Sequence, residues 1–412
     1  MATATLTKYD YQVRDRSGKL VTGQLEADNQ AAVASKLASM GYTPLSIDAV
    51  KETGLQMEIK IPGLSDRVKL KDLAIFSRQF ATMIASGLSL IRSLTILHEQ
   101  TDNKALAEVI AEIRNEVESG QSLSAAMAQH PKTFPKLFVA MVRAGEAAGM
   151  LDQVLLRVAA MYEADVKLRS KIKSAMTYPV IVLIMAIGLS AAMLIFIVPV
   201  FEGMFRDLGG ELPLLTRVLV RMSEFMTSPL GALVFLGLPI GLWFTYKQVR
   251  ANEKGRFALD TFKLRVPVFG PLFHKIALSR FARNLSTLLA AGVPILQALE
   301  ITADTVNSGP ISLAVRDVQS SVREGESIHS PLSTHEVFPP MVVQMIAVGE
   351  ETGNVDGMLT KVADFYDMEI ESTTESLTAM MEPLMIGVIG GIVGGMVIAL
   401  YMPMFAIFDM IQ

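Results

Sequence analysis

The sequence predicts a mainly α-helical integral membrane protein with three transmembrane helices, two homologous cytoplasmic six-helix bundles and a small N-terminal α+β module. Three observations support this fold class. Uncharged apolar runs occur at three places, one helical pattern occurs twice, 204 residues apart, and β-like runs occur near the N-terminus. Apolar residues make up 51% of the chain and charged residues only 19%, which is typical of a membrane protein with soluble parts.

Residues 1–50 are predicted to form the α+β module. Two short β-like runs precede a helix at about 29–40, and a third extended run follows it. Asp28 is suited to cap this helix at its start, and Gly41 is suited to end it. The polar residues 51–71 are predicted to form a linker.

A shift of 204 positions aligns one half of the chain with the other. Twelve of the thirty residues from 134 to 163 are then identical, including a Phe-Pro pair and a Gly-Glu-x-x-Gly motif. The similarity continues into the apolar runs that follow, because Pro179 aligns with Pro383. Each copy is therefore predicted to be a helical bundle followed by a transmembrane helix.

The two bundles are predicted at residues 72–174 and 275–378. Apolar residues recur at helical spacing on one face of an early helix in each copy. They are Leu73, Phe76, Phe80, Met83 and Ile84 in the first copy, and Phe281, Leu285, Leu288 and Leu289 in the second. Glycines and prolines divide each copy into about six helices, which are expected to bury their apolar faces against one another.

The membrane-spanning helices are predicted at residues 175–201, 225–246 and 379–408. Each is long enough to cross a hydrocarbon layer of about 30 Å. The intervening segments are expected to be an outer loop at 202–224 and a basic linker at 247–274, and an outer tail follows at 409–412. The N-terminal segment has no apolar stretch of the kind found in a cleaved signal peptide, so the N-terminus is expected in the cytoplasm and the C-terminus outside.

Basic residues support this orientation and are expected to contact lipid headgroups. They are Lys167, Arg169, Lys171 and Lys173 before the first span, and Lys247 and Arg250 after the second. Because cytoplasmic flanks carry an excess of Lys and Arg, both flanks are assigned to the cytoplasmic side of the bilayer.

The Gly-Glu-x-x-Gly motif is the first candidate site. It comprises Gly145, Glu146 and Gly149 in one copy and Gly349, Glu350 and Gly353 in the other. In one interpretation the glycines allow a tight corner between helices and the glutamate accepts hydrogen bonds from free N–H groups at the start of the next helix. In the other, the corner is a surface that a partner recognises.

A glycine ridge in the last span is the second candidate site. It consists of Gly387, Gly390, Gly391, Gly394 and Gly395. Small residues at this spacing let another helix approach closely within lipid. The expected neighbour is another span of this chain, a span of a second copy, or the transmembrane helix of a different protein.

The sequence predicts no catalytic, cofactor or metal site. Nucleotide-binding and hydrolase motifs do not occur, cysteine is absent, and the five histidines are scattered. The net charge of −4 and the position of the basic clusters beside apolar runs argue against nucleic-acid binding. The predicted spans carry no ionisable residue at mid-depth, which disfavours a permease or a membrane enzyme.

Given the duplicated Phe-Pro and Gly-Glu-x-x-Gly motifs and the spans bounded by proline, the chain resembles the inner-membrane platform family of type IV pili and type II secretion (PilC/GspF). The resemblance implies a multi-pass scaffold of the bacterial inner membrane that is not an enzyme. Its implied partners are a cytoplasmic hexameric motor ATPase, pilin or pseudopilin subunits, other inner-membrane assembly proteins and further copies of itself. A pilus platform is favoured, and a secretion platform is the alternative.

Overall fold

The computed structural model describes residues 7–14, 20–27, 30–39, 41–49, 68–207 and 213–411, and it divides into two compact units, residues 1–67 and 68–412. In the first unit, strands β1 (Thr7–Arg14), β2 (Leu20–Ala27) and β3 (Thr43–Ala49) form an antiparallel sheet in the order β2-β1-β3. Helix α1 (Gln30–Ser39) packs Val33 and Leu37 against Val13 of β1. This is the predicted small α+β module. Asp28 and residues 51–67 of the predicted linker lie outside the described residues.

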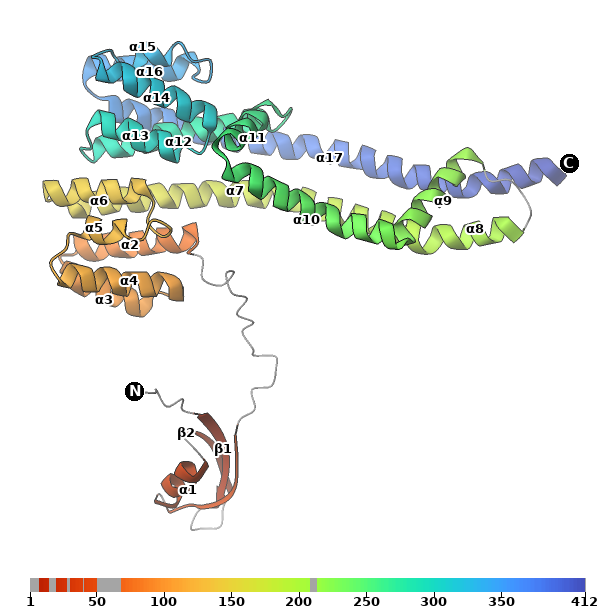
Figure 1. The fold of residues 1–412 in the computed structure, drawn as a ribbon, viewed down its shortest axis with the longest axis horizontal. Helices are drawn as coiled ribbons and strands as arrows, with labels where there is room; N and C mark the ends of the chain where they lie inside the picture. The colour runs from red at the N-terminus through yellow and green to blue at the C-terminus, as the bar shows by residue number, and fades with distance from the viewer. Residues whose placement is uncertain are drawn as a thin grey trace. The chain divides into compact units, whose positions relative to one another are not determined.

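The second unit contains the two repeats, each with six helices. The first repeat has α2 (Leu70–Ala85), α3 (Leu90–Gln100), α4 (Lys104–Glu118), α5 (Leu123–Ala128), α6 (Lys136–Ala148) and α7 (Leu151–Ala192). The second has α12 (Gly270–Ala290), α13 (Ile295–Thr305), α14 (Gly309–Arg323), α15 (His329–Leu332), α16 (Pro340–Thr352) and α17 (Val355–Ile411). Figure 1 shows the short helices of each repeat gathered along one end of its long helix, α7 or α17.

The buried apolar side chains of both bundles form one connected core. In the first bundle a row of aromatic rings runs from Phe76 through Phe134 and Phe138 to Tyr162, with successive centroids 5.6, 5.1 and 5.9 Å apart. The second bundle retains one equivalent ring contact, between Phe281 and Phe338. The two copies therefore share a helical plan and fill their cores with different side chains.

The long helices continue beyond their bundles without a break in helical structure. At about 1.5 Å per residue, the 42 residues of α7 extend roughly 63 Å and the 57 residues of α17 roughly 85 Å. A five-residue π-helical segment, η1 (Met193–Ile197), connects α7 to α8 (Val198–Asp207). Among the described residues, two helical stretches are long and apolar enough to cross a membrane, Leu151–Met204 and Val355–Pro403.

The connecting segments contain more helix than the sequence predicts. Most of the described part of the expected outer loop belongs to α8 and α9 (Leu214–Thr227), and the expected basic linker contains the end of α10 (Pro229–Ala251), α11 (Glu253–Arg265) and the start of α12. α9 is helical because Thr216, Leu219, Val220 and Ser223 share one face, which is buried. The hydroxyls of Thr216 and Ser223 donate to the carbonyls of Ala399 and Leu194, so α9 joins α17 to η1.

Candidate functional site

The two Gly-Glu-x-x-Gly corners have nearly the same geometry in both repeats. α6 ends at Gly149 with φ 67°, and α16 ends at Gly353 with φ 70°, a left-handed conformation that favours glycine. A Cβ atom at Gly145 would lie 3.0 Å from Cβ of Val154, and one at Gly349 would lie 2.8 Å from Cα of Val355. Glycine at these positions therefore lets the following long helix approach closely.

The glutamate of each corner caps a short helix upstream of the corner. Glu146 accepts hydrogen bonds from the N–H groups of Leu123 and Ser124, at 2.5 and 3.0 Å, at the start of α5. Glu350 does the same for Ile328 and His329, at 2.5 and 3.1 Å, at the start of α15. The sequence predicts a capping role but assigns it to the next helix, whereas the N–H groups lie more than twenty residues upstream. Recognition of either corner by a partner stays a prediction.

Replacing Glu350 with alanine is expected to destabilise the second bundle. The change leaves two backbone N–H groups and Nδ1 of His329 without their acceptor, which costs about 1–3 kcal/mol. The loss is measured as a lower thermal midpoint of unfolding of the detergent-solubilised chain, with limited proteolysis as the probe of unfolding. Glu351→Ala is the matched control, because Glu351 is the next residue in the chain and its side chain is exposed. Equal midpoints for the two variants would contradict a capping role.

Ion pairs connect the two repeats across their interface. Lys136 of α6 lies 2.7 Å from Asp304 of α13, and Asp304 also bonds to Arg316 of α14 at 3.0 Å. Burial raises the pKa of Asp304, but hydrogen bonds and attraction from Lys136 and Arg316 outweigh this effect, so its pKa lies below its usual value. The carboxylate therefore stays charged at neutral pH and links α6 of the first bundle to α13 and α14 of the second.

Acidification is expected to remove the contribution of Asp304. Because its folded pKa is depressed, the stabilisation is complete above its unfolded pKa of about 3.9 and is lost as pH falls through the folded value. At pH 7, Asp304→Asn should lower stability by about 0.2–1 kcal/mol, the range for partly exposed pairs. Thermal midpoints measured at intervals from pH 7 down to pH 2 test this, because the difference from the unmodified chain should shrink as pH falls below the unfolded pKa of about 3.9. A difference that does not shrink with falling pH rejects the electrostatic explanation.

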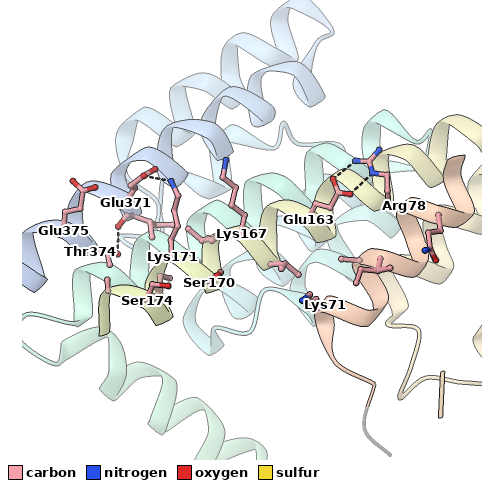
Figure 2. A pocket seen from close by; sticks show the side chains of 18 residues that line it. Lys71, Arg78, Glu163, Lys167, Ser170, Lys171, Ser174, Glu371, Thr374 and Glu375 are labelled. Atoms are coloured by element: carbon pink, nitrogen blue, oxygen red, sulfur yellow. Dashed lines mark hydrogen bonds and ion pairs between the residues drawn. The ribbon is translucent and has the colours of Figure 1, made fainter. Parts of the chain in front are cut away.

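A groove of about 780 Å³ lies beside α7 where this helix leaves the first bundle (Figure 2). Ala74 and Ile75 of α2, Val166 and Ile172 of α7 and Ile370 of α17 belong to its lining. Two ion pairs, visible in Figure 2, bridge the helices that form it. Arg78 of α2 bonds to Glu163 of α7 at 2.6 Å, and Lys171 of α7 bonds to Glu371 of α17.

The helices beside this groove are joined by a small apolar cluster. Leu168 and Ile172 of α7 pack with Ile370 and Leu377 of α17 and with Leu272 of α12. This contact lies outside the shared core of the bundles and before the uncharged apolar runs that begin at Pro179 and Pro383. We call it the joint cluster, because it holds the two long helices together where they leave their bundles.

The predicted headgroup residues occupy different surroundings. Lys167 and Lys171 line the groove, Arg169 pairs with Asp165, and Lys173 is exposed. Lys247 lies 5.2 Å from the ring of Trp243, and Arg250 lies 6.0 Å from the ring of Tyr246. A cation beside an aromatic ring just after an apolar helix is an arrangement typical of membrane interfaces.

The glycine ridge of α17 is uncovered within the part of the chain that the structure describes. A Cβ atom placed at any of the five glycines has no contact within 4 Å outside the local backbone of α17. Between residues 384 and 401, the buried residues are Met385, Met396, Ala399 and Leu400, and the last three pack against η1 and α9. The ridge is thus open to a helix from another molecule, and such packing stays a prediction.

Comparisons with known proteins agree with the duplicated architecture. A family model described as type II secretion system (T2SS), protein F matches residues 76–199 and again 281–403, and the model for the N-terminal domain of that protein matches residues 1–48. The chain is 44% identical to the type IV pilus assembly protein PilC of Thermus thermophilus, over 97% of this chain and 98% of the relative. It is 43% identical to PilC of Myxococcus xanthus, over 98% and 95%. It is also 31% identical to the type II secretion system protein F of Vibrio cholerae, over 89% and 90%.

Proposed function

Because the chain belongs to the type II secretion system protein F family, we propose that it is the inner-membrane platform of a type IV pilus assembly machine. In this role it couples a cytoplasmic motor ATPase to the insertion or removal of pilin subunits and does not itself hydrolyse nucleotide. The higher identity to relatives named as pilus assembly proteins supports the pilus over the alternative, a platform of type II secretion.

One observation carries this proposal: two packed bundles each continue into a long apolar helix. α7 and α17 are held together at the joint cluster and meet again where η1, α8, α9 and α17 pack around Leu194, Val198, Leu219 and Leu400. Because α7 and α17 are linked at two levels, neither helix can tilt without disturbing both clusters. We call this pair of linked helices the frame. A displacement applied to the bundles therefore reaches the apolar part of the frame.

The interface between the bundles also supports a three-span topology. Because the bundles share one core, they lie on the same side of the membrane, so the chain between them crosses an even number of times. If α7 crosses outward, α10 returns, and its 23 residues extend about 35 Å. We assign two spans to residues 175–201 and 379–408, with the N-terminus in the cytoplasm and the C-terminus outside. Of the predicted span 225–246, we assign the part that belongs to α10, because α9 ends at Thr227 and the chain is extended at Ser228.

The proposed partners follow from the two ends of this frame. The bundles face the cytoplasm and present charged surfaces to the motor. The apolar helices present the uncovered glycine ridge of α17 to a membrane helix, which in this machine belongs to a pilin or to a second copy of the chain. The predicted headgroup residues, which belong to α7 and α10, hold this frame at the level of the lipid headgroups.

Co-purification tests the proposal. A tagged chain should capture both the motor ATPase and pilin from cells, and a Gly391→Leu variant should lose the membrane-helix partner while retaining the motor. Gly188→Leu, in the apolar part of α7, is the matched control, since both glycines have open space around them. Failure of the unmodified chain to capture either partner, or nucleotide hydrolysis by the purified chain, contradicts the proposal.

A further inference from the structure

A cavity of about 420 Å³ lies between α11 and the turn that connects α13 to α14. Its lining is strongly basic. Arg250, Lys254, Arg256, Lys263 and Arg316 contribute five cations, and Asp260 and Asp304 contribute two carboxylates. The lining therefore carries a net positive charge and favours an anion.

Pairing leaves part of this positive charge available. Arg316 bonds to Asp304 and Lys263 bonds to Asp260, at 3.0 and 3.2 Å. Lys254 and Arg256 form no ion pair with the residues that the structure describes. An anion that enters the cavity therefore meets two cations that no carboxylate among the described side chains neutralises.

The N-terminus of α14 forms one wall of the cavity. This 15-residue helix begins at Gly309, whose N–H group donates to Asp260 at 3.3 Å, a long hydrogen bond. The next residue, Pro310, has no N–H group, so the Gly309 N–H and the helix dipole are what favour negative charge at this end. The Asp260 carboxylate accepts from Gly309, and a bound anionic oxygen would take its place there.

Ser308 provides an independent indication of a ligand. It is the N-cap residue of α14, yet its hydroxyl makes no capping hydrogen bond. The residue is only 6% exposed and lines the cavity, and its Oγ atom is buried without a hydrogen-bond partner. A buried hydroxyl without a partner is costly, so a ligand oxygen at this position would satisfy it.

We propose that this cavity is a binding site for a phosphate group, held by the Ser308 hydroxyl, the N-terminus of α14 and the side chains of Lys254 and Arg256. A phosphate fits because its several oxygens can accept from a hydroxyl, a backbone N–H and two cations together. The group comes either from an anionic lipid headgroup or from a soluble phosphate. A lipid headgroup can reach the cavity because Arg250, in its lining, lies only four residues beyond Tyr246 at the end of the apolar run.

Titration of the full chain with inorganic phosphate, in an uncharged detergent and chloride buffer, tests the site by calorimetry. Ser308→Ala should weaken binding about tenfold, as expected for loss of a hydrogen bond to a charged group, and Lys254→Gln/Arg256→Gln should weaken it about a hundredfold. Ser308→Ala should not lower the thermal midpoint, because it removes a hydroxyl without a partner. Arg323→Gln, near the opposite end of α14, is the matched control and should bind phosphate normally.

Bilayer composition distinguishes the two sources. If the group is a lipid headgroup, the chain from phosphatidylglycerol nanodiscs retains this lipid in native mass spectrometry. Ser308→Ala then reduces the amount of lipid retained, and free phosphate does not displace the lipid. If the group is soluble, phosphate binds equally in phosphatidylcholine and phosphatidylglycerol nanodiscs. Either pattern supports the site. Phosphate and lipid binding that both variants leave unchanged overturns it, and this result would leave the platform function untouched.

Discussion

Replacing Ser170 with proline is expected to abolish pilus assembly while the chain remains in the membrane at its normal level. Ser170 is exposed in α7, between the joint-cluster residues Leu168 and Ile172. Proline removes the hydrogen bond from residue 170 to the carbonyl four residues earlier and kinks the helix, at a cost of about 3 kcal/mol. A kink here separates the motion of the first bundle from that of the apolar part of α7.

The measurement is the number of surface pili per cell, together with the amount of chain in the membrane fraction. Ser170→Ala is the matched control, because alanine preserves the helix and removes only an exposed hydroxyl. Limited proteolysis of both variants shows whether the bundles remain folded. Normal piliation by Ser170→Pro at normal protein levels would mean that helix continuity is not required for the function.

Replacing Phe138 with alanine is expected to destabilise the first bundle by about 3–5 kcal/mol. Phe138 is completely buried, and its ring lies between those of Phe134 and Tyr162. The loss combines the transfer free energy of the ring with the cavity that remains, because neighbouring helices relax only in part. Its counterpart in the second repeat is Val342, so Val342→Ala should cost less, about 1.5 kcal/mol.

Chemical denaturation of the solubilised chain measures the loss of stability in the Phe138→Ala and Val342→Ala variants. Tryptic cleavage within each bundle shows which of the two bundles has unfolded. Phe365→Ala is a suitable control because this aromatic side chain of α17 is 41% exposed. It should change stability by less than about 0.5 kcal/mol. A Phe138→Ala variant as stable as this control would show that the aromatic row does not hold the first bundle together.

Periodicity and repetition predict most of the helical plan. The two six-helix repeats follow from apolar spacing and from glycine and proline breaks, because these features act within a few residues. The capping role of Glu146 is also predictable from its residue type. Its partners at Leu123 and Ser124 are not, because only the packing of α6 against α5 brings them together.

Features that depend on tertiary structure escape sequence reasoning. Lys136 and Asp304 are 168 residues apart, and nothing in either local sequence indicates that they pair. The helices α9 and α11 lie in segments that the sequence predicts as an outer loop and a basic linker, because charged segments that separate long apolar runs are typical of connections. Ser308 carries no signal in the sequence, since only its burial without a hydrogen-bond partner distinguishes it from other serines.

Labelling of single cysteines tests most directly whether both repeats lie on the cytoplasmic side and feed the same membrane frame. The chain has no cysteine of its own, so each introduced cysteine gives an unambiguous signal. Lys132→Cys and Glu336→Cys place labels at exposed, equivalent positions of the two repeats. Arg221→Cys on α9 reports the outer side. In intact spheroplasts an impermeant maleimide should label only residue 221, and lysis should expose 132 and 336 together. Labelling of 132 or 336 alone before lysis would place the bundles on opposite faces and contradict the account.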